Sequence, residues 1–253
     1  MAERFRSFRV EGVVLKQRDW GEADRIITVF TRENGKMRMI AKGARKIQSR
    51  KAGHVEPFTH IELQLDKTKD LPIINQVETV EPFFTIRDSL PAMTLGMFVL
   101  ELVDRFTREE EGEDEPLFAL LCETLRRLET IEDKWLAVSY FQLRLLDCLG
   151  YRPSFFQCAS CQKPIQAVDQ YFSPDAGGVL CPECGAKHQG TWKLRVEPLR
   201  FFRHFQRSTF TDAQKAEVPV DVRKQMDKLM QDHLSYLLER NLNTPKFMYG
   251  IND

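Results

Sequence analysis

Four of the six cysteines in this 253-residue sequence form two Cys-X-X-Cys pairs. Cys158 and Cys161 make the first pair, Cys181 and Cys184 make the second, and 19 residues lie between the pairs. Two intervening residues let both thiolates of a pair face one ion, and this distance between pairs is typical of a four-cysteine zinc site. Gly185 is expected to give the second turn conformational freedom. Because four thiolates leave no position for a catalytic water, we predict one structural zinc ion per chain, held by these four cysteines.

The alternative to a metal site is a pair of disulfides, which form in oxidising compartments. Residues 1–6 lack the apolar stretch of a secretory signal, and the longest apolar run, about residues 95–100, is far shorter than the roughly 18 residues that cross a bilayer. We therefore expect a soluble, cytoplasmic protein with reduced thiols. The remaining cysteines, Cys122 and Cys148, fall on apolar faces of expected helices and are interpreted as small buried hydrophobes.

A second concentration of chemistry is a run of cations in residues 32–51, which carries a net charge of +7 because Glu33 is its one acidic residue. Such a run repels itself unless an anion compensates it. Its first half lies on one strand face and its second half in a Gly- and Ser-containing loop, an arrangement with which small barrels follow a phosphate backbone. An ordinary solvated face is the alternative. The predicted DNA-binding residues are Arg32, Lys36, Arg38, Lys42, Arg45, Lys46, Arg50 and Lys51.

Aromatic residues accompany cations in two places. Trp20, Phe30 and Phe58 are candidates for base stacking near the basic run, or else core residues. In residues 199–210, arginines alternate with Phe201, Phe202 and Phe205. On a helix these arginines would face outward as a solvated face or as an auxiliary DNA contact, made by Arg200, Arg203 and Arg207.

The elements that must position these residues differ along the chain. The first 80 residues alternate apolar and polar positions, are rich in β-branched residues and contain the hairpin signal Asn34-Gly35. They predict five short antiparallel strands, which suit a small barrel. The expected strands are residues 9–16, 24–31, 36–42, 58–66 and 71–80.

Helical periodicity replaces this pattern beyond Pro82 and Pro91. Residues 153–193 have little periodicity and are interpreted as an inserted metal knuckle. The expected helices are residues 95–106, 117–128, 135–149 and 219–242.

Charge is segregated although the net charge is zero, since residues 1–80 carry +5, 85–134 carry −7 and 186–253 carry +4. No Walker A, nucleophile-elbow, HExxH or dinucleotide-binding motif occurs, and the five histidines are scattered. These observations give no support to ATP hydrolysis or covalent catalysis, and we predict a protein that is not an enzyme.

Several runs resemble those of the bacterial RecO family of DNA repair proteins. They occur in the family's order, together with the four-cysteine knuckle, over nearly the whole chain. The runs are residues 22–35 (EADRIITVFTRENG), 41–45 (AKGAR), 57–59 (PFT), 100–104 (LELVD), 141–146 (FQLRLL) and 149–151 (LGY).

This resemblance implies an α+β multidomain protein with three parts. They are an N-terminal five-stranded OB-fold barrel that binds DNA (residues 1–81), an α-helical domain (82–152 and 194–253) and an inserted four-cysteine zinc knuckle (153–193). It also implies a nucleoid-associated recombination mediator that binds single- and double-stranded DNA and anneals complementary strands without ATP. Its implied partners are RecR and the C-terminal tail of the single-stranded DNA-binding protein, which together allow RecA loading. The family's Lys/Arg-rich C-terminal segment is reduced here to Lys246 within residues 242–248.

The primary hypothesis is therefore a DNA-binding mediator in which a basic surface lowers the repulsion between two phosphate backbones. Two other classes remain open at this stage. One is a nuclease that uses the cysteine-bound metal. The other is an interaction scaffold whose acidic middle binds a protein partner while DNA affinity is weak.

Overall fold

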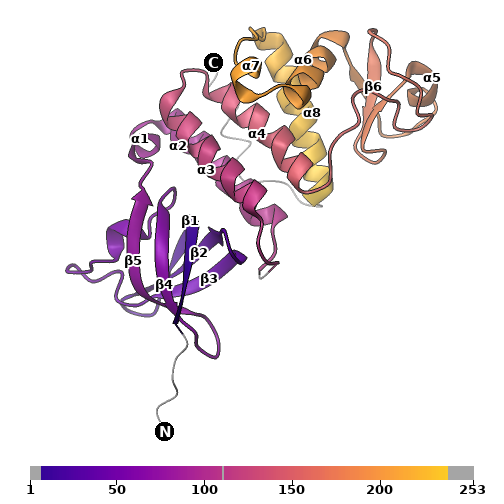
Figure 1. Cartoon of the computed structure of the whole chain (residues 1–253). Coiled ribbons are helices and arrows are strands. Elements are labelled where there is room, and N and C mark those ends of the chain that lie inside the picture. The colour runs from indigo at the N-terminus through magenta and orange to yellow at the C-terminus, as the bar shows by residue number, and fades with distance from the viewer. Residues whose placement is uncertain (1–6, 110, 239–253) are drawn as a thin grey trace. The chain divides into compact units, whose positions relative to one another are not determined.

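The structure, a computed structural model, describes residues 7–109 and 111–238. It divides into two compact units, one of described residues up to Lys134 and one from Trp135 onward, and each is described by itself (Figure 1). Within these residues no helix combines the length and the apolar character that spanning a membrane requires. The predicted C-terminal tail, including Lys246 and the last residues of the helix expected over 219–242, lies outside the described residues.

The first unit begins with a closed barrel in the strand order β1-β2-β3-β5-β4, which confirms the predicted five-stranded barrel (Figure 1). The turn at Asn34-Gly35 joins β2 to β3 as a hairpin, with Thr31 opposite Gly35. The strands are β1 (Ser7–Trp20), β2 (Asp24–Thr31), β3 (Gly35–Ala41), β4 (His60–Asp66) and β5 (Ile73–Glu81).

One pairing differs from the expected antiparallel arrangement. Strands β3 and β5 run parallel, with Ile40 opposite Ile73. The reason is geometric, because strand direction cannot alternate all the way around a closed ring with an odd number of strands. Strand β1 is also longer than expected: its first half pairs with β4, its second half pairs with β2, and a bulge between Val14 and Lys16 bends it from one partner toward the other.

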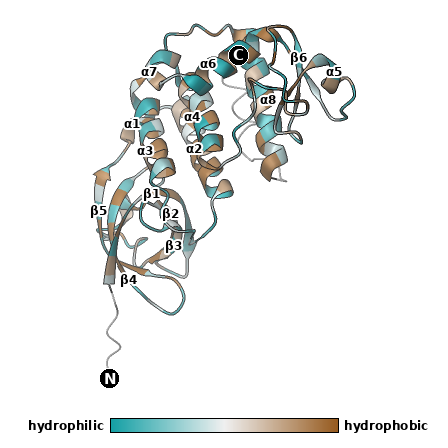
Figure 2. Ribbon diagram, turned by 45° about the vertical axis from the view of Figure 1, so that its right-hand side comes forward, coloured by the Kyte–Doolittle hydropathy of each residue, from teal (hydrophilic) through white to brown (hydrophobic). Residues whose placement is uncertain are grey.

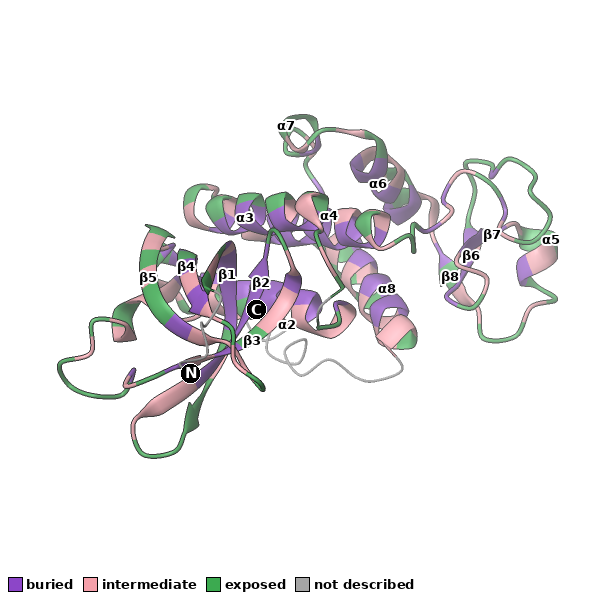
Figure 3. Ribbon diagram, turned by 60° about the horizontal axis from the view of Figure 1, so that its bottom comes forward, coloured by how far each residue is buried: buried purple, intermediate pink, exposed green. Residues whose placement is uncertain are grey.

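Alternating side chains fill the barrel. Each strand sends its apolar positions inward, as the period of two requires, and the loops between the strands are largely exposed (Figure 3). The core residues are Val10, Val14, Ile27, Val29, Met39, Ala41, Ala44, Val55, Ile61, Leu63, Leu65 and Ile74.

Three helices complete the first unit: α1 (Phe84–Asp88), α2 (Leu90–Phe106) and α3 (Glu115–Thr130). Hydrophobic and hydrophilic positions alternate around them (Figure 2). Side-chain caps begin the two longer helices, since Ser89 accepts a hydrogen bond from the Ala92 N–H and Asp114 accepts one from the Leu117 N–H. Helix α2 packs directly on the barrel at Gly96, where an added Cβ would lie 2.8 Å from the ring of Phe58.

The second unit contains α4 (Lys134–Cys148), α6 (Val196–Arg207), α7 (Phe210–Ala213) and α8 (Val220–Leu238). Residues 153–193, expected to have little regular structure, contribute the short helix α5 (Pro182–Gly185) and part of a three-stranded sheet in the order β7-β6-β8. Its strands are β6 (Gln170–Ser173), β7 (Gly178–Leu180) and β8 (Trp192–Leu194), which are too short for a periodic pattern to reveal them.

A buried histidine joins this sheet to α8. His233 is 1% exposed, and its ring meets the Phe172 ring edge-on at a centroid distance of 5.3 Å. Among the residues that the structure describes, neither ring nitrogen has a hydrogen-bond partner. Burial lowers the pKa of His233 to about 4, so the folded state keeps this ring neutral.

We expect His233 to make the protein less stable in mild acid. Its pKa in the unfolded chain is about 6.5, above the folded value, so protonation favours unfolding as pH falls below about 6.5. From pH 7.5 to pH 5 this linkage costs about 2 kcal/mol of unfolding free energy. Urea titrations of the wild type and of His233→Phe at both pH values measure it, and the variant should lose about 2 kcal/mol less.

The comparison with the variant separates the contribution of His233 to the pH dependence of stability from that of Asp227, which lies on the same helix. Burial raises the pKa of Asp227 to about 6, and its protonation therefore acts in the opposite direction as pH falls. Because Asp227 is present in both proteins, its contribution cancels in the difference. Equal pH dependence of the two proteins would contradict the assignment.

Candidate metal centre and basic surface

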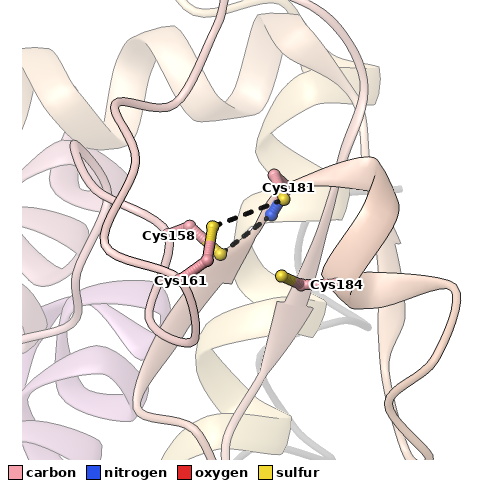
Figure 4. Close-up of side chains that lie close together, drawn as sticks. All are labelled: Cys158, Cys161, Cys181 and Cys184. Carbon is pink, nitrogen blue, oxygen red and sulfur yellow. Dashed lines mark hydrogen bonds between the residues drawn. The ribbon is translucent and has the colours of Figure 1, made fainter.

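The four cysteine sulfurs converge on one point. Their Sγ atoms all lie within 4.8 Å of one another, and the Cys161 and Cys181 sulfurs are 3.9 Å apart. Cys158 and Cys161 come from one loop, whereas Cys181 directly precedes α5 and Cys184 lies within it (Figure 4). Four sulfurs at about 2.3 Å from a tetrahedral zinc ion are about 3.8 Å apart, so these residues fit the group.

Backbone N–H groups favour the thiolate of Cys158. The Cys181 N–H donates to the Cys158 sulfur at 3.3 Å. Burial opposes ionisation of Cys158, but the N–H groups of Cys161 and Cys181 outweigh it and lower the pKa of Cys158 to about 6. A hydrogen bond with the Cys181 sulfur raises the pKa of Cys184 to about 12. A bound cation would therefore be needed for all four sulfurs to ionise together.

The outer parts of this cluster are packed against the small sheet. Gly185 matters for a reason other than the expected backbone freedom, because a Cβ there would lie 2.3 Å from the Tyr171 ring. Phe155 stacks on Phe202 of α6, with ring centroids 5.0 Å apart. No disulfide joins any of the six cysteines, all of which lie among the described residues. Of the two outside the cluster, Cys122 is buried as expected, whereas Cys148 is exposed because it ends α4 next to a turn.

Arg203 stabilises the packing of α6 against the cysteine loop. Its guanidinium donates to the carbonyl of Phe155 at 2.8 Å and to the carbonyl of Ile165 at 3.0 Å, so it ties α6 to the loop that carries the first cysteine pair. Arg207 covers the Phe156 ring at 3.6 Å and remains exposed, as does Arg200. Of the three predicted auxiliary residues, two are therefore free to meet a ligand and one holds the fold together.

The predicted basic surface divides into two parts. Three cations on or next to the strands are engaged by acidic residues of the same unit. The Lys36 ammonium lies 3.4 Å from an Asp104 carboxylate oxygen and also donates to the Asp104 carbonyl. Arg38 forms an ion pair with Glu109 at 2.6 Å, and Arg32 forms a bidentate ion pair with Glu115. We call residues 104–115 the acidic segment.

Sequence reasoning missed these partners. The compensating anion that the +7 run requires was attributed to a ligand, but the chain supplies part of it from the acidic segment. The available signal was the opposite charge of residues 1–80 and 85–134. The ion pairs of Arg32 and Arg38 are exposed and contribute little to stability, so these two arginines can exchange their partners for another anion, whereas the Lys36–Asp104 pair is largely buried.

The remaining cations lie on the basic loop, which we define as residues 42–51. Arg45 fixes this loop to the turn between β1 and β2, because its N–H donates to the Ala23 carbonyl at 2.9 Å and its guanidinium pairs with Asp19 at 3.2 Å. Lys51 is half-buried and donates to the Ile74 carbonyl at 2.6 Å. In the described part of the chain, no ion pair or hydrogen bond engages the exposed side chains of Lys42, Lys46 and Arg50.

The three aromatic candidates for base stacking differ in exposure. Phe30 and Phe58 are 1% and 3% exposed and belong to the core, whereas Trp20 at the end of β1 is 50% exposed. Trp20 thus lies at the same rim of the barrel as the basic loop.

Comparison with known proteins gives one consistent family. The family described as "Recombination protein O N terminal" matches residues 5–83, and "Recombination protein O C terminal" matches residues 87–246. The "DNA repair protein RecO" of Roseiflexus sp. (strain RS-1) is 34% identical over 97% of this chain and 86% of its own length. Those of Heliobacterium modesticaldum and Desulforamulus reducens are 32% and 31% identical, over 94% and 95% of this chain and 88% and 93% of their own lengths.

Proposed function

This chain belongs to the RecO family of DNA repair proteins, and we propose that it binds single- and double-stranded DNA through the basic loop and anneals complementary strands without ATP. The observation that carries the proposal is the group of unengaged cations on an OB-type barrel. Lys42, Lys46 and Arg50 can each neutralise a phosphate without first breaking an ion pair. A surface that lowers repulsion between two backbones and leaves the base edges free promotes pairing without making a bond.

The proposal includes a structural role for zinc and a set of protein partners. Zinc would bind at Cys158, Cys161, Cys181 and Cys184, where it would hold the two loops together and leave no position for a reacting water. With RecR, and through the tail of the single-stranded DNA-binding protein, the chain would help to load RecA on coated strands, as the family resemblance implies. Arg200 and Arg207 would supply a weaker auxiliary DNA contact.

A strand-annealing assay tests the proposal. Complementary labelled oligonucleotides, naked or coated with single-stranded DNA-binding protein, are mixed with the purified full chain without nucleotide across a salt series. We expect faster annealing than without the chain, and the acceleration should decline as salt rises because phosphate contacts release counterions. Annealing that requires ATP, or that is no faster than without the chain at any salt, would reject the proposed function.

The acidic segment should restrain DNA binding. We expect the double variant Glu109→Gln, Glu115→Gln to bind single-stranded DNA about fivefold more tightly at about 100 mM salt, because it frees Arg38 and leaves Arg32 paired with Glu11 alone. The slope of log affinity against log salt should steepen by at least about 0.7, which is the contribution of one phosphate contact by Arg38. Fluorescence anisotropy over a salt series measures both quantities.

A matched control separates freed cations from a general loss of negative charge. Glu111 and Glu113 are exposed residues of the acidic segment, and neither forms an ion pair with a described residue of the barrel. The double variant Glu111→Gln, Glu113→Gln removes the same charge and should leave the salt slope unchanged. If both double variants behave alike, the ion pairs to Arg38 and Arg32 are not what limits binding.

A further inference from the structure

Trp20 is an exposed aromatic residue at the rim of the barrel. It ends β1, where it pairs with Asp24 at the start of β2, and half of its side-chain surface is exposed although indole rings are usually well covered. Its ring N–H has no hydrogen-bond partner among the described residues.

The surroundings of the ring are cationic. Arg18, two positions earlier on the same strand face, places its guanidinium 5.5 Å from the Trp20 ring centroid. Arg45 fastens the basic loop to the turn that follows Trp20. The rim thus presents an aromatic face within a set of cations that suits a polyanion, whereas an apolar protein partner would leave those charges desolvated.

A second apolar side chain projects from the middle of the same loop. Ile47 is fully exposed, while Ala44 and Val55 on either side anchor the loop in the barrel core. Ile47 lies between Lys46 and Arg50, two of the unengaged cations. The loop therefore holds an apolar group away from the core, among charges that attract phosphates.

An aromatic ring and a branched apolar side chain next to phosphate-binding cations match the chemistry of unpaired bases. The faces of unpaired bases are open, whereas those in a duplex are covered by their neighbours. From this geometry, and building on the proposed DNA binding, we infer that Trp20 stacks on an unpaired base and that Ile47 packs against a neighbouring base. The rim would thereby select single strands over duplexes, with phosphates held by Lys42, Lys46 and Arg50.

The test uses two oligonucleotides of equal length and charge, oligo-dT and an abasic strand that keeps the sugar-phosphate backbone without bases. The full chain should prefer oligo-dT by about tenfold, since stacking contributes about 1–3 kcal/mol per base. Trp20→Ala should lose about tenfold on oligo-dT and less than about twofold on the abasic strand, with an unchanged salt slope. Trp20→Phe should restore most of the preference, and Ile47→Ala should lose a smaller part of it.

Phe84 provides the matched control. It is 64% exposed in the same unit and carries Arg87 at 5.7 Å from its ring centroid, yet it lies on α1 and not at the barrel rim. Phe84→Ala should leave the preference intact. Equal wild-type affinity for both strands, or equal losses of Trp20→Ala on both, would overturn the inference while leaving the proposed DNA binding in place. Absence of binding to either strand would instead reject the proposed function, on which the inference rests.

Discussion

Replacing Cys158 and Cys161 with serine should remove the bound metal and lower the melting temperature of the second unit by about 10 °C or more. The four sulfurs converge from two separate segments of the chain, so a metal ion bound there would contribute directly to folding. A loss of about 3 kcal/mol produces a shift of this size in a unit of about 100 residues. Elemental analysis and calorimetry of reduced, metal-replete protein measure the two effects.

The wild type should contain one zinc ion per chain, and Cys148→Ser, which changes an exposed cysteine outside the cluster, should retain it. Annealing should be less affected than stability, because the cluster belongs to a different unit from the basic loop. Well under one zinc per chain in the wild type, or full occupancy in the double serine variant, would contradict the metal site.

Reversing the charge of Lys42, Lys46 and Arg50 together is expected to weaken binding to single-stranded DNA about a hundredfold at 50 mM salt. Each lost phosphate contact reduces the salt slope by about 0.7, so three contacts reduce it by about 2. The loss should be similar for different sequences because phosphates carry no base identity. These side chains are exposed and make no ion pair within the described residues, so the fold should survive the change.

A triple variant of equal net charge provides the control for this prediction. Lys163, Lys187 and Lys193 are exposed cations of the second unit. Their replacement by glutamate should reduce affinity by less than about fivefold, through long-range repulsion alone. Equal losses in the two triple variants, or a wild-type affinity that ignores salt, would reject the assignment of the basic loop.

The sequence predicted those features that depend on neighbours along the chain. The alternation of apolar positions and the Asn34-Gly35 turn predicted the strands of the barrel, and the cysteine spacing predicted the cluster. The parallel pairing of β3 with β5 followed from closure of the ring, which a strand-by-strand pattern does not contain.

Ion pairs and side-chain exposure that depend on contacts between distant parts of the sequence could not be predicted from local patterns. Lys36 and Asp104 are 68 positions apart, so a local count of charges could not show that they pair. Trp20, Phe30 and Phe58 had equal standing as stacking candidates until their exposed fractions separated them. The strands of the small sheet are three or four residues long, which is too short for a period to be recognised.

The contact of Asp104 with two strands has a consequence for how the chain can be divided. The Asp104 carboxylate forms ion pairs with Lys16 of β1, at 2.5 Å, and with Lys36 of β3. The Lys36 side chain is 12% exposed. A fragment cut after β5 would leave that ammonium without its partner and uncover the Phe58 ring that packs at Gly96. We therefore expect the barrel and helices α1 to α3 to unfold as one cooperative unit. The barrel's strand pairing is complete by Glu81, but its stability is completed only by residues that follow it.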